Sequence, residues 1–391
     1  MKRCIACGAP LWEKPLLTLD HMPASAQHIP DEKQVKEDEG IALRLCQCTG
    51  CGLVQFDCEP VDYYRDVIRA GGYSTTMVEL RRYQYRHLID TYHLEGKRFL
   101  EVGCGQGEFL KLLTEFPVEA HGVEHDARLV ELAKEQGLSV EQGFTEREDT
   151  IFSGGPYDVF LSFNFLEHQP NPGVMLQSIY RNLTPEGMGL VTVPSFEYIM
   201  EHNGYYELIR DHIAYYTFDT LAALLERNGF QVLEYEMVNR DTLSFVVKKR
   251  PLTDVSNLME GFEEVGREME AYLKYLSAWK KRVAIWGASH QGFTLAATTR
   301  LGEQARYIID SAPFKQGRFA PASHLPIVSP EHFHEEPVDA IVITAPGYTD
   351  EIAGIIEEKF GSQVEVMAMR SNHLERLKGP KKEDLPWNGL S

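Results

Sequence analysis

Short apolar runs alternate with amphipathic stretches through the middle of the chain. The run RFLEVG at 98–103 predicts a strand, and the segment EFLKLLTEF after it has the spacing of a helix. The same pair repeats in EAHGVEHD and ARLVELAKEQG, which ends at Gly137. Further strands are predicted at 157–168, 188–195, 231–238 and 242–249. Strands that alternate with helices predict an α/β fold with a doubly wound, mainly parallel sheet.

The pattern changes on both sides of this region. Residues 73–93 predict a helix that leads into it. After it the rhythm breaks near Pro251, and a charged helix over 255–279 precedes a second β–glycine–α unit. We therefore expect three domains: a small module at 1–66, a cofactor-binding domain at 67–250 and a Rossmann-like α/β domain at 251–391.

Composition and charge narrow the possible partners. The chain has 391 residues and a formal net charge of −19, with no basic stripe that would bind a nucleic acid. No apolar run is long enough to span a bilayer, and the start, MKRCIACG, lacks the apolar core of a signal peptide. We therefore expect a cytoplasmic protein that acts on a small molecule, without nucleic-acid or membrane partners. The oligomeric state is left open.

Six of the seven cysteines lie in the first 58 residues. Cys4 and Cys7 form one C-x-x-C pair, and Cys48 and Cys51 form another, so each pair can direct two thiolates at one tetrahedral ion. A set of four thiolates leaves no open coordination position, which predicts a structural zinc. Cys46 remains an alternative to Cys48 as a ligand.

A glycine-rich loop follows the first strand of the central region. Gly103, Gly105 and Gly107 are spaced G-x-G-x-G, which differs from the G-x-G-x-x-G of dinucleotide sites. This shorter spacing is the one seen in class I methyltransferases that use S-adenosylmethionine. Glu124 ends the next strand and can accept hydrogen bonds from both ribose hydroxyls of such a cofactor.

Two more residues complete the expected cofactor site. Glu101 would face the methionine end and its sulfonium, and Asn164, in the predicted strand 157–168, is the other candidate cofactor-binding residue. Glycine-rich turns also occur in other α/β proteins, and Glu101 can instead make local hydrogen bonds.

These features together resemble the sugar C-methyltransferases of deoxysugar biosynthesis, over nearly the whole chain. The matching segments are C-I-A-C-G, C-T-G-C-G-L-V-Q (48–55), G-Y-S-T-T (72–76), E-V-G-C-G-Q-G (101–107), L-E-H (166–168), D-H-I-A-Y-Y-T (211–217), W-G-A-S-H-Q-G-F-T-L (286–295) and I-I-D-S-A-P-F-K-Q-G-R (308–318). The resemblance implies an enzyme with a zinc-binding module, an S-adenosylmethionine-binding domain and a C-terminal domain that helps to enclose the substrate.

The family's usual substrate is a nucleotide-linked 4-keto-6-deoxy sugar. A base removes the C3 proton, which is acidic because it is α to the C4 ketone, and the resulting enolate takes the methyl group. The resemblance implies His212 as this base, with Asp211 orienting it or stabilising its imidazolium. It also implies that His168 shapes the pocket. Tyr73, Tyr215 and Tyr216 could donate hydrogen bonds to the enolate oxygen, with aromatic packing as the alternative role for at least one of them. A structural role for His212 is the alternative.

The chain departs from the family pattern at positions where substrate is expected. The family's Y-H-E-H reads I-R-D-H at 209–212, its H-G-G-S reads N-R-D-T at 239–242, and a lysine is replaced by Gln291. A second hypothesis is therefore methylation of another small molecule at carbon, oxygen or nitrogen. A third is a nucleotide- or NAD-binding protein, which the loop at 287–292 disfavours because it lacks the full dinucleotide fingerprint.

Overall fold

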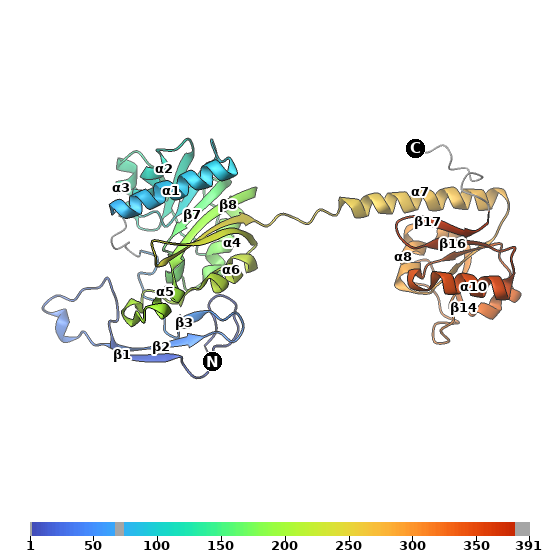
Figure 1. Ribbon diagram of the computed structural model, residues 1–391, viewed down its shortest axis with the longest axis horizontal. Helices are drawn as coiled ribbons and strands as arrows, with labels where there is room; N and C mark the ends of the chain where they lie inside the picture. Colours follow the sequence, from blue (N-terminus) through green and yellow to red (C-terminus); the bar gives the residue numbers. More distant parts are fainter. Residues whose placement is uncertain (1, 67–73, 380–391) are drawn as a thin grey trace. The chain divides into compact units, whose positions relative to one another are not determined.

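The computed structural model describes residues 2–66 and 74–379. The chain forms two compact units, Met1–Leu252 and Thr253–Ser391, which are described separately here (Figure 1). Among the described residues, every helix is too short or too polar to cross a lipid bilayer.

A seven-stranded sheet forms the centre of the first unit. Its strand order is β10-β11-β8-β7-β4-β5-β6. The five strands from β8 to β6 are parallel, whereas β11 runs antiparallel to both of its neighbours. The strands are β4 (Arg98–Val102), β5 (Glu119–Glu124), β6 (Ser139–Gln142), β7 (Tyr157–Phe163), β8 (Leu183–Pro194), β10 (Phe230–Val238) and β11 (Thr242–Lys249). The predicted α/β fold with a doubly wound, mainly parallel sheet is confirmed.

Helices cover both faces of this sheet because alternate strand residues point to opposite faces. Phe99 packs with the helices α1, α2 and α3, whereas the next residue, Leu100, packs with α4 and α6. The helices and short 3-10 turns of the unit are α1 (Thr75–Tyr92), α2 (Glu108–Leu113), α3 (Ala127–Glu135), η2 (Leu166–His168), α4 (Pro172–Asn182), α5 (Phe196–Glu201), η3 (Tyr205–Glu207) and α6 (Phe218–Arg227).

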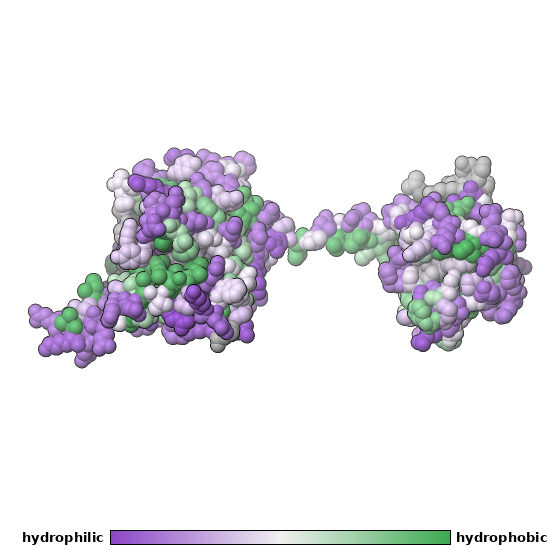
Figure 2. Space-filling model, turned by 60° about the horizontal axis from the view of Figure 1, so that its bottom comes forward, coloured by the Kyte–Doolittle hydropathy of each residue, from purple (hydrophilic) through white to green (hydrophobic). Residues whose placement is uncertain are grey.

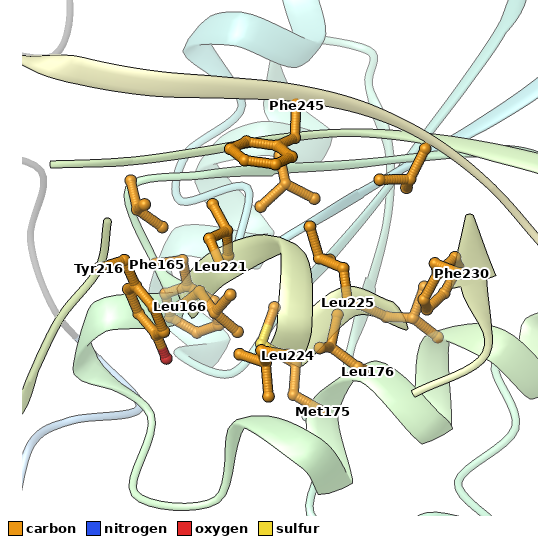
Figure 3. Packing of buried hydrophobic residues seen from close by; sticks show 14 of the residues in the cluster. Phe165, Leu166, Met175, Leu176, Tyr216, Leu221, Leu224, Leu225, Phe230 and Phe245 are labelled. Atoms are coloured by element: carbon orange, nitrogen blue, oxygen red, sulfur yellow. The ribbon is translucent and has the colours of Figure 1, made fainter. Parts of the chain in front are cut away.

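Helix α6 shows how one of these faces is filled. Thr217 begins the helix with a capping box, in which its hydroxyl accepts from the Thr220 N–H and the Thr220 hydroxyl accepts from the Thr217 N–H. Leu221, Leu224 and Leu225 follow on one side of the helix and are buried between α4 and the sheet (Figure 3). Deleting one such leucine side chain typically costs about 2–5 kcal/mol of stability.

The N-terminal segment is joined to the central domain by a second sheet. Its order is β1-β2-β3-β9, and the N-terminal segment supplies β1 (Leu17–Met22), β2 (Ile41–Gln47) and β3 (Val54–Phe56). A short 3-10 turn, η1 (Gln34–Lys36), lies between β1 and β2 in the chain. The last strand, β9 (Ala214–Tyr215), comes from far along the chain and pairs with β3. The cysteine-rich segment therefore shares a sheet, and part of its core, with the domain that follows it.

The second unit is another α/β domain. Its sheet has the order β14-β13-β12-β15-β16-β17, and only β17 is antiparallel to its neighbour. Its elements are α7 (Ser256–Ala278), β12 (Val283–Trp286), α8 (His290–Thr298), α9 (Leu301–Gln304), β13 (Ala305–Ile309), β14 (Ile327–Val328), η4 (Pro330–His334), β15 (Ala340–Ile343), η5 (Pro346–Tyr348), α10 (Thr349–Phe360), β16 (Glu365–Met369) and β17 (Leu374–Lys378).

Helix α7 has two different halves. Met269, Tyr272 and Leu273 in its second half are buried against the sheet of the second unit. Leu258 and Phe262 in its first half are exposed within the described residues, and they form part of an apolar strip along that half (Figure 2).

Candidate active site

The glycine loop lies directly after β4, at the carboxyl edge of the parallel strands, where open α/β sheets bind ligands. Gly103, Gly105 and Gly107 have φ angles of +70°, +60° and +86°, which side chains rarely adopt. Space adds a second requirement, because a β-carbon at Gly107 would lie 2.4 Å from Cδ1 of Leu138. Glycine is therefore favoured at these three positions, where the loop presents only its main chain.

Glu124 stands at the end of β5, and it braces this loop. One carboxylate oxygen accepts from the Gly105 N–H at 2.8 Å, and the other accepts from the Asp126 N–H at 3.0 Å. A carboxylate offers about four lone-pair positions, so both oxygens can still accept from ribose hydroxyls. Glu101 lies on β4 and is fully buried.

Asn164 follows β7 with a φ of +48° and is tied to β8. Its N–H donates to the Thr192 carbonyl at 2.8 Å, and its side-chain oxygen accepts from the Thr192 hydroxyl at 3.1 Å. The same hydroxyl accepts from the guanidinium of Arg81, which lies 3.6 Å from the ring centroid of Phe163. The buried cation Arg81 was not predicted, because nothing in the sequence distinguishes it from the exposed charges of α1.

Two histidines meet beyond the end of β7. His168 lies in η2 and His212 in the segment before β9, and their ring centroids are 4.7 Å apart at an interplanar angle of 75°. Burial lowers the pKa of His168 to about 4, and burial together with the neighbouring His168 lowers the pKa of His212 to about 3. Both imidazoles are therefore neutral at neutral pH.

The two rings differ in their surroundings. His168 is almost fully buried, and its Nδ1 hydrogen-bonds to the main-chain carbonyl of Asp211 at 2.8 Å, which leaves Nε2 as the acceptor. His212 is partly exposed, and its ring makes no hydrogen bond with residues 2–66 or 74–379. Glu167 completes the group, in which one ligand atom from each of the three residues lies within 4.8 Å of the other two, close enough for them to share a metal ion.

The carboxylate of Asp211 is bonded to two residues other than His212. It accepts from the hydroxyl of Tyr63 at 2.6 Å and from the N–H of Ala26 at 3.0 Å. Both partners come from the N-terminal segment. Within the described chain the carboxylate makes no hydrogen bond to either histidine, and it is the main chain of Asp211 that holds His168.

The tyrosines are placed as follows. Tyr73 lies outside the described residues. Tyr215 and Tyr216, which could have donated to an enolate, are both buried. The Tyr215 hydroxyl is bonded to the main chain of Ile209, and Tyr216 belongs to the core around α6 (Figure 3).

The four predicted cysteine ligands gather at one point. The Sγ atoms of Cys4, Cys7, Cys48 and Cys51 all lie within 4.8 Å of one another, whereas Cys46 is not part of this group. Main-chain N–H groups point at two of the sulfurs, from Ala6 to Cys4 and from Gly50 and Cys51 to Cys48. Four thiols supported in this way fit a tetrahedral zinc ion.

Two family models match the chain. Residues 77–235 match a methyltransferase domain, and residues 248–367 match a C-methyltransferase C-terminal domain. C-methyltransferase NovU from Streptomyces niveus is 23% identical over 384 residues, which cover 89% of this chain and 90% of that protein. The chain is a member of this C-methyltransferase family.

Other similarities to this C-methyltransferase are partial. A ubiquinone biosynthesis O-methyltransferase from Actinobacillus pleuropneumoniae is 31% identical over 104 residues, covering 24% of this chain and 44% of that protein. Among solved structures, the PH0226 protein from Pyrococcus horikoshii has a TM-score of 0.39 at 16% identity and covers 48% of this chain and 99% of its own. The methyltransferase domain model and the relative NovU identify the protein as an S-adenosylmethionine-dependent methyltransferase enzyme, as the sequence predicted.

Proposed function

We propose that this C-methyltransferase methylates C3 of a nucleotide-linked 4-keto-deoxy sugar through an enolate. The observation that carries the proposal is the pair of neutral histidines His168 and His212 beside the cofactor loop. Phe165, three residues before His168, packs its ring against Gly103 of that loop. A proton acceptor next to a methyl donor is the arrangement that carbon methylation α to a ketone requires.

His212 is the base in this proposal, because its partly exposed ring has an available nitrogen. The C3–H bond breaks and the proton moves to His212, while the electron pair forms the C3–C4 double bond and charge develops on the C4 oxygen. That negative charge stabilises the imidazolium beside it. His168 packs against the ring of His212 and is itself held by the main chain of Asp211.

The glycine loop, Glu101, Glu124 and Asn164 would hold the cofactor. S-adenosylmethionine, when bound, supplies an electrophilic methyl group to which the enolate carbon bonds as the carbon–sulfur bond breaks. The loop backbone permits close approach of the cofactor, and Glu124 would accept hydrogen bonds from its ribose hydroxyls. Zinc would be structural in this proposal, because four thiolates leave no coordination position for substrate.

Hydrogen exchange at C3 tests the base directly. The protein is incubated in deuterated water with S-adenosylhomocysteine and a panel of nucleotide 4-keto sugars, and the C3 proton is followed by NMR. We expect exchange with at least one sugar, and a loss of at least about 100-fold in His212→Ala, as general-base catalysis contributes 10²–10⁴. His202→Ala is the control, because His202 is exposed and stacks on Tyr198.

A second candidate function is methylation of a different small molecule. The residues 239–242, which replace the family's H-G-G-S, form the tight turn between β10 and β11, with Asn239 and Arg240 at φ angles of +48° and +70°. The Asp241 carbonyl of this turn accepts from the Ser195 N–H at 2.7 Å. Absence of exchange across the whole sugar panel would favour this candidate over the sugar.

A further inference from the structure

The carboxylate of Asp211 is held by the N-terminal segment. Asp211 is buried, and its two oxygens accept from Tyr63 and from the main chain of Ala26. The Tyr63 hydroxyl is also within 2.6 Å of the Ser25 hydroxyl, which accepts from the His28 N–H at 2.8 Å. This buried carboxylate is therefore bound by Tyr63, 148 residues earlier in the chain, and by the turn that contains Ala26, 185 residues earlier.

The residues on either side of Asp211 are fixed by the same segment. Arg210 donates from its guanidinium to the Ala24 carbonyl at 3.0 Å and to the Glu59 carbonyl at 3.4 Å. On the other side, the Ile213 carbonyl accepts from the Phe56 N–H at 3.0 Å, next to the pairing of β3 with β9. The segment that carries His212 is thus hydrogen-bonded to the N-terminal segment at residues 210, 211 and 213.

The main chain of the same segment also makes hydrogen bonds to His168 and its neighbour Glu167. The Asp211 carbonyl binds His168, and the Ile213 N–H donates to the Glu167 carbonyl at 2.9 Å. A shift of the main chain at Asp211 would therefore move both His168 and the adjacent His212. Hydrogen bonds to a carboxylate are stronger than bonds between neutral groups, and the Asp211 carboxylate is buried, so the bond from Tyr63 is well suited to prevent such a shift.

We propose that Tyr63 is a positioning residue for the histidine pair and acts through Asp211. Through this contact, the cysteine-rich segment sets the geometry of proton abstraction in addition to its structural role. The proposal rests on the proposed function, since it gives the histidines a role in proton transfer. Burial and the bond to Asp211 also raise the pKa of Tyr63, so that it remains a hydrogen-bond donor.

Tyr63→Phe removes the hydroxyl and keeps the ring. We expect the rate of C3 exchange and the kcat of methyl transfer to fall about tenfold, the order expected for losing one hydrogen bond to a charged group. KM and the affinity for S-adenosylhomocysteine should stay within about twofold of wild type, because the cofactor loop is untouched. Tyr64→Phe is the matched control, because its hydroxyl contacts Arg65 and not Asp211.

A double-mutant cycle separates positioning from general stabilisation. If Tyr63 acts through Asp211, Tyr63→Phe should have little further effect on kcat in an Asp211→Ala background. Additive losses, or a parallel loss of kcat and of cofactor affinity, would overturn the proposal.

A substrate-free measurement keeps this proposal distinct from the proposed function. In protein with ¹⁵N-labelled histidine, the Nδ1 proton of His168 should shift in Tyr63→Phe and stay unchanged in Tyr64→Phe. An unchanged resonance in both variants overturns the positioning role, whichever molecule the enzyme methylates. No exchange by wild-type protein with any keto sugar, together with a shifted resonance, would overturn the sugar assignment alone.

Discussion

At the scale of single residues, the site depends on positions where backbone and side chain have little freedom. The glycines of the cofactor loop and the acidic ends of β4 and β5 were predictable, because the chemistry of each is visible in a local motif. The partners of Asp211 were not predictable, because Tyr63 and Ala26 are distant in sequence and no periodicity links them to it. For the same reason Arg81 escaped notice, since burial of a helical arginine depends on tertiary packing.

Gly107→Ala tests the cofactor loop at this scale. The added β-carbon would meet Leu138 at 2.4 Å as well as an unfavourable φ of +86°, so the loop must move. We expect affinity for S-adenosylhomocysteine to fall at least about tenfold, and stability to fall by about 2 kcal/mol or more. Calorimetry and urea denaturation measure the two effects.

Gly137→Ala is the matched control for this change. Its φ is +78°, but a β-carbon there would have no heavy atom within 4 Å. It should cost about 1 kcal/mol of stability from backbone strain and leave cofactor affinity unchanged. Equal loss of affinity in both variants would mean that the loop does not contact the cofactor.

At the scale of elements, local periodicity predicted the helices well, whereas the pairing of short strands distant in sequence could not be predicted. The helices expected at 73–93 and 255–279 are observed as Thr75–Tyr92 and Ser256–Ala278. The two-residue strand β9 was missed, because so short a segment has no periodicity of its own and exists through its pairing with β3. That pairing is what brings the cysteine-rich segment beside the histidines.

Metal content tests the four-cysteine group of this segment. We expect one zinc per chain, which Cys48→Ser should lose and Cys46→Ser should retain, because only Cys48 belongs to the four-sulfur group. Loss of zinc should also destabilise the unit, since metal binding is coupled to folding. Metal analysis and thermal unfolding with and without a chelator measure this.

The opposite pattern, with zinc lost from Cys46→Ser and kept by Cys48→Ser, would overturn the ligand assignment. A second metal equivalent that disappears in His168→Asn would show that Glu167, His168 and His212 bind an ion, and would contradict the role of His212 as the base.

At the scale of the whole molecule, two α/β units follow one another, and only the first carries the methyltransferase loop. In the second unit, Asp310 directly follows β13, at the place where dinucleotide folds present an acidic residue to a ribose. Its carboxylate accepts from the Ala288 N–H, much as Glu124 accepts from Gly105, but it is also paired with Lys315, both at 2.9 Å. The ion pair with Lys315 disfavours the alternative of a nicotinamide-dependent enzyme.

Calorimetry on the full chain tests that distinction. We expect S-adenosylhomocysteine to bind at one site per chain in the micromolar range, and NAD to give no binding heat. Glu124→Ala should abolish or strongly weaken the first signal, because it removes the acceptor for the ribose. Binding of NAD without binding of S-adenosylhomocysteine would reverse the assignment of the cofactor.

Transfer of a labelled methyl group tests the central claim most directly. The protein is given S-adenosylmethionine with a ¹³C-labelled methyl group and the nucleotide 4-keto sugar that exchanges its C3 proton, and the product is examined by NMR. We predict a new ¹³C methyl signal coupled to C3 of the sugar. A label found on oxygen or nitrogen, or no transfer to a sugar that exchanges, would contradict carbon methylation through an enolate.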